Sequence, residues 1–126
     1  MIKSKNTKPE LTVRKFLHSN GLRYRLHQKK LPGTPDIVLT KYKTIVNVHG
    51  CFWHGHKDCR YYILPKTRTE WWISKIEKNK TNDIRNSLAL KAKGWKVIDI
   101  WECELKKDKK NSTLVTLLSM FKNQII

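Results

Sequence analysis

The densest group of chemically reactive side chains lies in residues 48–59, which read Val-His-Gly-Cys-Phe-Trp-His-Gly-His-Lys-Asp-Cys. This segment holds three of the chain's five histidines and two of its three cysteines, together with two large aromatic side chains. Cysteine thiolates and histidine imidazoles are the usual ligands of zinc in proteins. The segment is therefore predicted to be a metal-stapled loop beside a reaction centre.

A zinc site can be completed by a cysteine from much later in the chain. Cys51, Cys59 and Cys103 cannot all pair with one another, and the chain carries no secretion signal, so metal binding outranks disulfide formation. The residues alone leave open whether His54 or His56 is the fourth ligand. The alternative is that the cysteines are buried free thiols, because cysteine often behaves as a small core hydrophobe.

Two carboxylates stand out because the chain has only 10 acidic residues. Glu10 lies on the first predicted helix and Asp36 lies at the start of a predicted strand, directly after Pro35. Carboxylate oxygens are the ligands that Mg²⁺ prefers, so both residues are candidates for a catalytic metal site. Each also has a structural alternative: Glu10 could complete a capping box with Thr7, and Asp36 could accept backbone hydrogen bonds after the proline.

The histidines that do not bind zinc are candidates for proton transfer. An imidazole has an ordinary pKa near 6.5, which suits a general base or acid near neutral pH. His49 and whichever of His54 and His56 is left over are therefore candidate catalytic residues. His18 and His27 fall outside the cluster, and the sequence gives neither of them a role.

Aromatic side chains gather near this centre in a strongly basic chain. Such side chains can stack on exposed bases or insert between base steps, although about half of them are expected to fill the core instead. A helix face with a lysine and an asparagine four residues apart offers further contacts to a base or phosphate. The aromatic residues are Phe52, Trp53, Trp71 and Trp72, and the helix-face pair is Lys75 and Asn79.

The overall charge favours a polyanion as partner. The chain has 126 residues and a formal net charge of +17, from 27 basic and 10 acidic side chains spread along its length. A field of this sign and size is typical of nucleic-acid binding. No apolar run approaches the roughly 20 residues of a spanning helix, so a cytoplasmic protein without membrane contact is expected. The length predicts one domain over residues 1–126, with residues 1–6 as a short flexible arm.

Hydrophobic periodicity and turn residues predict the elements that position these side chains. A first helix is expected over 8–19, after a cap at Thr7. Strands are expected over 22–26, 36–39 and 44–48 as a meander, and 51–66 is expected to be irregular. A long helix over 67–93, a strand over 95–101 and a last helix from Asn111 or Ser112 to Phe121 complete an α/β order.

Four separate strings resemble the very short patch repair (Vsr) family of DNA mismatch endonucleases, over about residues 6–105. They are Pro35-Asp36, the run from His49 to Cys59, Thr67-Arg68-Thr69-Glu70 with Trp72, and Trp101-Glu102-Cys103. The string His-Gly-Cys-Phe-Trp-His is the most specific of them. The resemblance implies a restriction-endonuclease-like fold of the PD-(D/E)xK type, with a central mixed sheet flanked by helices and a zinc-stapled loop.

The resemblance also implies the activity and the roles of individual residues. It implies a Mg²⁺-dependent, strand-specific endonuclease that nicks double-stranded DNA on the 5′ side of the thymine in T:G mismatches left by deamination of 5-methylcytosine. By matching position, the magnesium site contains Asp36 and the backbone carbonyl of Val48. The catalytic set adds Glu10, His49 and His54; the structural zinc set is Cys51, His56, Cys59 and Cys103; the DNA contacts are Phe52, Trp53, Trp72, Lys75 and Asn79.

Two other functions stay open at this point. One is a nicking nuclease of a restriction or defence system with a different target, and the other is a non-catalytic, zinc-containing DNA-binding module. The resemblance further implies a bacterial protein that acts as a monomer, with a functional link to a DNA cytosine methyltransferase and to mismatch-repair proteins.

Overall fold

A computed structural model describes residues 7–52, 54–56, 59–60 and 62–122 of the chain. The predicted arm at residues 1–6 and the predicted DNA contact Trp53 lie outside these residues. Within them, three helices, two 3-10 turns and four strands follow one another in the order α1, β1, β2, η1, β3, α2, β4, η2, α3. The α, β, β, β, α, β, α order predicted from the sequence is confirmed.

The first helix begins and ends where its capping residues predict. Helix α1 spans Lys8–Ser19, and the side-chain oxygen of Thr7 accepts a hydrogen bond from the Glu10 amide at 3.4 Å. Pro9 lies in the first turn, where a missing amide hydrogen costs nothing. Gly21, with φ of +78°, ends the helix in the left-handed region that favours glycine. Thr7 therefore caps through the Glu10 backbone, which leaves the Glu10 carboxylate for other contacts.

The four strands form one mixed sheet in the order β1-β2-β3-β4. Strands β1 (Arg25–Leu26), β2 (Ile37–Leu39) and β3 (Thr44–His49) pair antiparallel, which confirms the predicted meander. Strand β1 is shorter than the predicted 22–26, although Leu22 is buried and Arg23 and Arg25 are exposed as the alternation predicted. Strand β4 (Lys96–Trp101) pairs parallel with β3 and places Trp101 beside His49.

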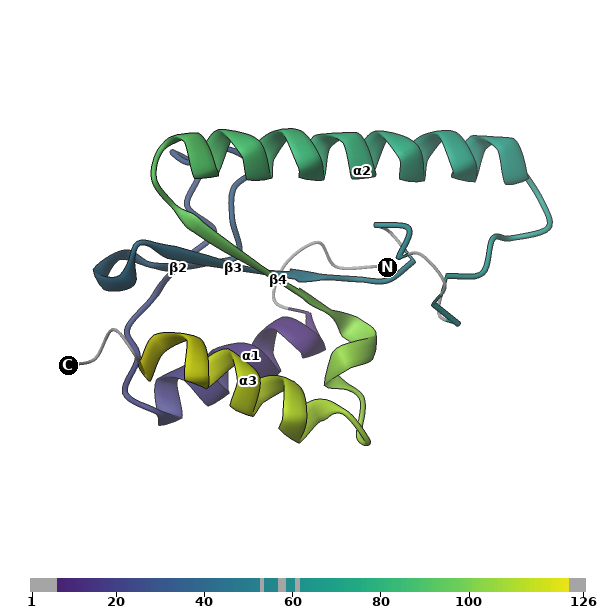
Figure 1. Cartoon of the computed structure of the whole chain (residues 1–126). Coiled ribbons are helices and arrows are strands. Elements are labelled where there is room, and N and C mark those ends of the chain that lie inside the picture. Colours follow the sequence, from purple (N-terminus) through teal and green to yellow (C-terminus); the bar gives the residue numbers. More distant parts are fainter. Residues whose placement is uncertain (1–6, 53, 57–58, 61, 123–126) are drawn as a thin grey trace.

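The parallel pairing requires a crossover, and helix α2 (Thr69–Ala92) supplies it. Its start differs from the predicted cap at Thr67: Arg68 is the N-cap residue, with a left-handed φ of 55° and no side-chain capping bond. The Thr69 hydroxyl instead donates back to the Pro65 carbonyl at 2.8 Å. Figure 1 shows α2 along one side of the sheet, with its first turns extending past the end of β3.

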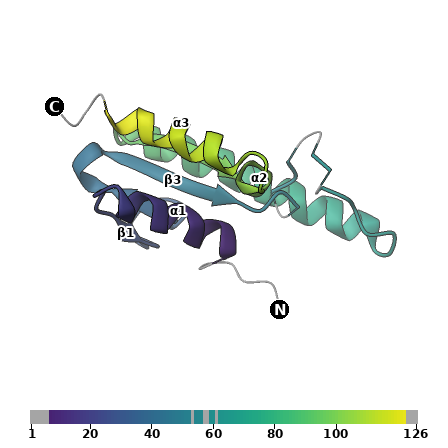
Figure 2. The same ribbon diagram turned by 90° about the horizontal axis from the view of Figure 1, so that it is seen from below.

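The sheet is covered by helices on both faces. Figures 1 and 2 show α2 on one face and α1 together with α3 (Lys110–Lys122) on the other. The alternation of side chains along each strand explains the two cores. Ile37 and Leu39 pack with Leu17 and Phe121 in the larger core, whereas Val38 faces the smaller core beneath Leu90 of α2. This three-layer arrangement fits the predicted α/β class.

The end of β4 is held to the last helix by a short turn. The 3-10 turn η2 spans Glu102–Leu105, and α3 begins at Lys110, just before the predicted caps. The Thr113 hydroxyl donates to the Glu104 carbonyl at 2.7 Å, and the Glu104 carboxylate accepts from the Trp101 amide at 2.9 Å. These bonds fix the position of Cys103. No helix in the described part of the chain is long and apolar enough to cross a membrane.

Candidate active site and metal centres

One open cleft of about 1270 Å³ runs between α2 and the ends of the strands. Most of the predicted site residues line it, although they come from α1, the start of β2, β3, the loop after β3 and α2. Lysine side chains of α2 line it as well, together with five acidic side chains, so the positive charge available to an anionic ligand comes from the α2 wall. The predicted residues on its walls are Glu10, Asp36, Val48, His49, Phe52, His54, His56, Lys75 and Asn79, and the added lysines are Lys80 and Lys91.

The two predicted metal-binding carboxylates lie together at one end of this cleft. Ligand atoms of Glu10, Asp36 and His27 all lie within 4.8 Å of one another. The Asp36 carboxylate accepts a hydrogen bond from the Val48 amide at 3.0 Å, so that the strand end and the carboxylate are held side by side. Burial raises the pKa of Asp36, and the neighbouring Glu10 charge adds to this, while the Val48 bond opposes it. A cation at this position would offset the repulsion between the Asp36 and Glu10 carboxylates.

His27 is a site residue that the sequence did not predict. Its Nε2 lies 3.1 Å from a carboxylate oxygen of Glu10, and its backbone amide donates to the Asp36 carbonyl at 3.1 Å. Glu10 is only 2% exposed and also accepts a bond from Arg14 at 3.3 Å. The φ of His27 is +45°, an uncommon value outside glycine, which ends the strand alternation there. That strained turn is what directs the ring toward Glu10.

Replacing His27 with alanine should lower the free energy of unfolding by about 1–3 kcal/mol, because a buried carboxylate then loses a partner. Glutamine can donate from a similar position and should restore part of this loss. Urea denaturation of both variants measures the difference, with His18→Ala as the control because His18 is exposed at the end of α1. Equal stability of His27→Ala and the unaltered chain would contradict the role of this contact.

Each of the two predicted catalytic histidines has a carboxylate partner. His49 Nε2 lies 2.8 Å from Asp99 of β4, and His54 Nδ1 lies 2.5 Å from Asp83 of α2. Burial lowers the pKa of His49, but the bond and charge of Asp99 outweigh it, and the net pKa is raised. The pKa of Asp99 is lowered, chiefly by its bond to His49. A carboxylate on one ring nitrogen fixes the tautomer and leaves the other nitrogen for chemistry.

Neither partner carboxylate was predicted, and a different signal could have found each. Asp99 stands two residues before Trp101, and the parallel register brings β4 alongside β3, so that the Asp99 carboxylate reaches His49. Asp83 follows Lys75 and Asn79 at helical spacing on α2 and lines the same cleft. For Asp99 the available signal was an isolated acid on an otherwise apolar strand. For Asp83 it was a third polar residue on one helix face.

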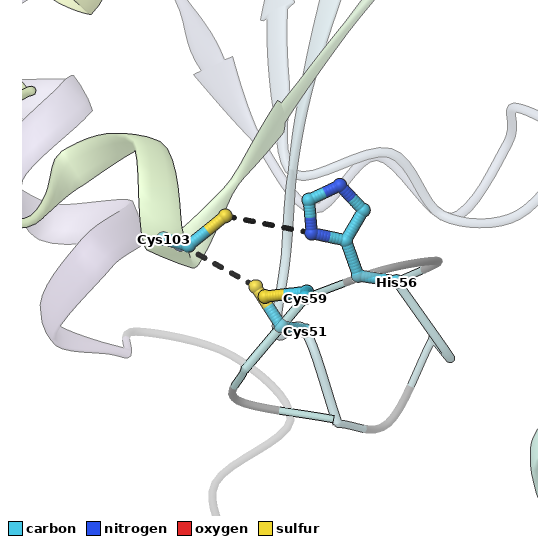
Figure 3. A group of neighbouring side chains, drawn as sticks. All are labelled: Cys51, His56, Cys59 and Cys103. Atoms are coloured by element: carbon cyan, nitrogen blue, oxygen red, sulfur yellow. Dashed lines mark hydrogen bonds between the residues drawn. The ribbon is translucent and has the colours of Figure 1, made fainter. Parts of the chain in front are cut away.

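A second cluster lies beside the cleft and contains every cysteine of the chain. Ligand atoms of Cys51, His56, Cys59 and Cys103 lie within 4.8 Å of one another, as Figure 3 shows. The Cys103 amide donates to Cys51 Sγ at 3.4 Å, and Cys103 Sγ lies 3.4 Å from His56 Nδ1. Burial raises the pKa of Cys51 to about 12 and raises that of Cys103. Three sulfurs and one imidazole nitrogen make a donor set that fits Zn²⁺.

Trp101 lies between the cysteine cluster and the catalytic histidines. The His56 ring stacks on it with a centroid distance of 4.1 Å and an angle of 6°, and His49 contacts it at 5.0 Å. The rings of His49 and His54 are in turn 4.6 Å apart. Because a stacked aromatic resists tilting of its neighbours, the cluster helps to set the positions of both histidines. Trp101 was predicted only as part of a strand and of the family pattern.

The predicted aromatic wedge is represented here by Phe52 and Trp72. Their rings meet edge to face at 5.3 Å, and Trp71 meets Trp72 at 4.9 Å. Trp71 is 47% exposed, with the Arg68 guanidinium 4.9 Å above its ring. Phe52 lines the cleft, whereas Trp72 does not line it and packs against the Phe52 ring. Trp71 is exposed and neither Phe52 nor Trp72 is fully buried, so none of the three described aromatics fills the core, although about half of the four were expected to.

Comparison with known proteins gives matches over most of the chain. Residues 1–61 match the family model described as DNA mismatch endonuclease Vsr. A Type II nicking enzyme, V.XorIIP of Xanthomonas oryzae, is 55% identical over 82% of this chain and 76% of its own length. Another, V.NmeAIP of Neisseria meningitidis, is 55% identical over 83% and 74%. The DNA mismatch endonuclease Vsr of Escherichia coli is 40% identical over 83% and 67%.

The family model covers the first half of the chain, the relatives match over 82–83% of it, and both agree with the resemblance noted in the sequence. A family of this kind implies a restriction-endonuclease-like fold, with which the mixed sheet and its flanking helices are consistent. The chain therefore belongs to the Vsr family of DNA mismatch endonucleases, and it is a DNA endonuclease.

Proposed function

We propose that this endonuclease nicks one strand of double-stranded DNA on the 5′ side of the thymine in a T:G mismatch, and that it requires Mg²⁺ to do so. One observation carries the proposal: Glu10, Asp36, His49 and His54 line a single cleft that also holds lysines of α2, although they are far apart in the sequence. Two carboxylates beside two imidazoles supply both the ligands and the proton acceptors that phosphodiester hydrolysis needs.

The donor set at the Asp36 end of the cleft fits magnesium. The Asp36 carboxylate and the Val48 carbonyl would hold the ion, and Glu10 and His49 would orient its water molecules. When bound, a divalent ion stabilises the negative charge that develops on the attacking and leaving oxygens. Val48 offers only its carbonyl, because its side chain has no oxygen. The bond from the Val48 amide to the Asp36 carboxylate keeps these two residues side by side, at the start of β2 and near the end of β3.

The hydrogen bonds of the two histidines support separate proton roles. With Nδ1 of His54 hydrogen-bonded to Asp83, its Nε2 is free to accept a proton from the attacking water. Asp83 then stabilises the imidazolium that results, as a carboxylate does in a catalytic triad. With Nε2 of His49 bonded to Asp99, its Nδ1 would be left to orient water on the ion. Asp83 and Asp99 act as positioning residues.

We further propose that Cys51, His56, Cys59 and Cys103 hold a structural zinc ion. The four residues join the irregular loop after β3 to the turn after β4, two segments that share no strand pairing. Thiolate ligation would fasten the loop that carries His54 against Trp101. On this proposal residues 1–126 form one endonuclease domain.

Contacts to DNA are proposed for the aromatic wedge and for one face of α2. Phe52, Trp53 and Trp72 would insert beside the mispair, where unstacking costs least because the base pair is already weakened. Lys75 and Asn79 line the cleft and would contact a phosphate or a base edge. The positive field of the whole chain would hold the duplex in the cleft.

Replacing Trp72 with alanine should weaken binding to a T:G duplex by about 1–3 kcal/mol, because Phe52 then loses the ring that supports it. Trp72→Phe keeps an aromatic ring and should retain most of the affinity. Fluorescence anisotropy in Ca²⁺, which does not support cleavage in most Mg²⁺ nucleases, measures both variants on mismatched and matched duplexes. An equal loss on both duplexes would show that Trp72 contributes to general binding rather than to mismatch recognition.

The names of two relatives favour a second candidate specificity in part. The relatives at 55% identity are named Type II nicking enzymes, whereas the relative named for mismatch cleavage is 40% identical. The alternative is therefore a nicking nuclease of a restriction or defence system with a different target. The third function raised by the sequence, a non-catalytic DNA-binding module, is set aside because the chain is an endonuclease.

The test is a nicking assay on end-labelled duplexes that differ at one base pair. T:G, T:A and C:G duplexes are each placed in several sequence contexts, and each is incubated with Mg²⁺ or with EDTA. The proposal predicts one new end 5′ of the thymine in T:G duplexes only, and only with Mg²⁺. Equal nicking of T:G and T:A would establish the alternative specificity, and nicking in EDTA would overturn the metal requirement.

The proposed partner is double-stranded DNA that carries a T:G mismatch. A mismatch of this kind arises where 5-methylcytosine is deaminated, so a functional link to a DNA cytosine methyltransferase and to mismatch-repair proteins is part of the proposal. Action as a monomer and a cytoplasmic location also stay predictions.

A further inference from the structure

The cleft contains a group of metal-binding side chains that the proposed reaction does not use as ligands. Ligand atoms of His49, His54 and Asp83 all lie within 4.8 Å of one another. The three residues come from the end of β3, from the loop after it, and from α2. We propose that they form a second metal site, distinct from the Asp36 site and from the cysteine cluster, which takes a transition-metal dication such as Zn²⁺, Co²⁺ or Ni²⁺ and blocks the catalytic histidines.

The chemistry of the donors separates this site from the magnesium site. Imidazole nitrogen binds zinc, cobalt and nickel well, whereas magnesium prefers carboxylate, carbonyl and water oxygens. Two imidazoles and one carboxylate leave further positions for water, as three-ligand metal sites in proteins do. The two ends of the cleft should therefore select different ions, with the hard ion at Asp36 and the softer ion at the histidines.

The geometry allows an ion to enter with a small adjustment. His54 Nδ1 and Asp83 Oδ2 are 2.5 Å apart, and one proton now lies between them. Two ligands of one tetrahedral zinc ion, each about 2.1 Å from it, stand roughly 3.4 Å apart, so Asp83 must retreat by about 0.9 Å. The side chains of His54 and Asp83 are 28% and 34% exposed, which gives the carboxylate room to move and gives the ion a path from solvent.

Asp99 supports the proposed site without being one of its ligands. It bonds Nε2 of His49 at 2.8 Å and so directs the Nδ1 lone pair away from itself. Metal-binding histidines in proteins usually have such a carboxylate on the second ring nitrogen, and its loss typically lowers metal affinity 10–100-fold. Asp99 also offsets part of the ion's charge. This arrangement, a histidine supported by an acid from a neighbouring strand, is what distinguishes the group from a chance meeting of three donors.

Occupation of this site would stop the proposed reaction, and that half of the inference rests on the proposed function. The ion would occupy the His54–Asp83 contact that orients the general base, and it would take the His49 nitrogen that faces the magnesium waters. Magnesium added at millimolar concentration would not displace it, because the ligands are mainly nitrogen. A softer ion should therefore inhibit nicking without competing with magnesium.

The binding test uses the zinc-loaded protein and Co²⁺ as the probe. Equilibrium dialysis and the visible absorption of Co²⁺ should reveal one further ion per chain, without the intense sulfur-to-cobalt bands that exchange into the cysteine cluster would produce. Asp83→Ala and His54→Ala should each lower the affinity for this ion at least tenfold, and Asp99→Asn should lower it 10–100-fold. His18→Ala and Asp108→Asn, both at exposed positions, are the matched controls.

The outcomes separate this site from the proposed function. Absence of a further cobalt ion, or an equal loss of affinity in His18→Ala, would overturn the site even if T:G nicking is found. Binding without inhibition of nicking would overturn the blocking role alone. Failure of all T:G nicking would overturn the proposed function and leave the binding result standing. Thermal melting of each variant verifies that a lost ion does not reflect a lost fold.

Discussion

Replacing Asp36 with asparagine should lower the rate of T:G nicking by at least about a thousandfold while the chain keeps its fold. Asparagine preserves the side-chain oxygen that accepts the Val48 amide at 3.0 Å, so the strand edge stays in place. It removes the negative charge that attracts a magnesium ion. Single-turnover nicking with excess protein measures the chemical step without interference from product release.

The control for this variant is Asp108→Asn, which makes the same chemical change at an exposed position outside the cleft. It should nick at the unaltered rate. Binding of Asp36→Asn to a T:G duplex in Ca²⁺ should stay within about threefold, since the proposed wedge and the lysines of α2 are unaltered. A variant that nicks at a tenth of the normal rate or faster would place the essential metal ligand elsewhere.

Removal of the proposed zinc ion should have the largest effect on stability. Structural zinc contributes its binding free energy to folding, so Cys103→Ser should cost several kcal/mol and lower the melting temperature by about 10 °C or more. The physical reason lies in the two segments that the cluster joins. Burial raises the pKa of Cys51 to about 12, so without an ion the cluster holds a neutral thiol and little attraction remains between the segments.

Metal analysis and calorimetry test this expectation together. The unaltered chain should contain about one tightly held zinc ion, and Cys103→Ser should contain much less. His56→Ala should behave like Cys103→Ser, whereas His18→Ala, at an exposed position on α1, should melt at the normal temperature. A chain that is fully folded, metal-free and as heat-stable as the zinc-loaded form would remove the structural role of the cluster.

The fold could be predicted from helix caps and side-chain alternation, because each of these signals acts over only a few residues. Thr7, Pro9 and Gly21 fix both ends of α1, and the alternation around Ile37–Leu39 fixes which side chains face which core. The extent of β1 could not be predicted in this way. It depends on pairing with only two residues of β2, and His27 leaves the extended conformation to reach Glu10. A tertiary contact overrode the local pattern.

The site was predictable where the residues form a string and not where they meet across the fold. The run from His49 to Cys59 carries its own pattern, Cys103 was predicted as the third cysteine of the chain, and the resemblance chose His56 over His54. The partners of the reactive groups were missed, because each comes from another element. Asp83 reaches His54 from α2, Asp99 reaches His49 through the parallel register of β4, and His27 reaches Glu10 from the end of β1.

The parallel pairing of β3 with β4 has a consequence for the order in which the enzyme becomes competent. During synthesis the ribosome releases Asp36, His49 and His54 well before β4, so an incomplete chain already contains the residues proposed for cleavage. It lacks Asp99, Trp101 and Cys103, which support both histidines and close the cysteine cluster. A chain that ends before β4 therefore lacks the groups that position both histidines, and we expect it to nick DNA far more slowly than the complete chain.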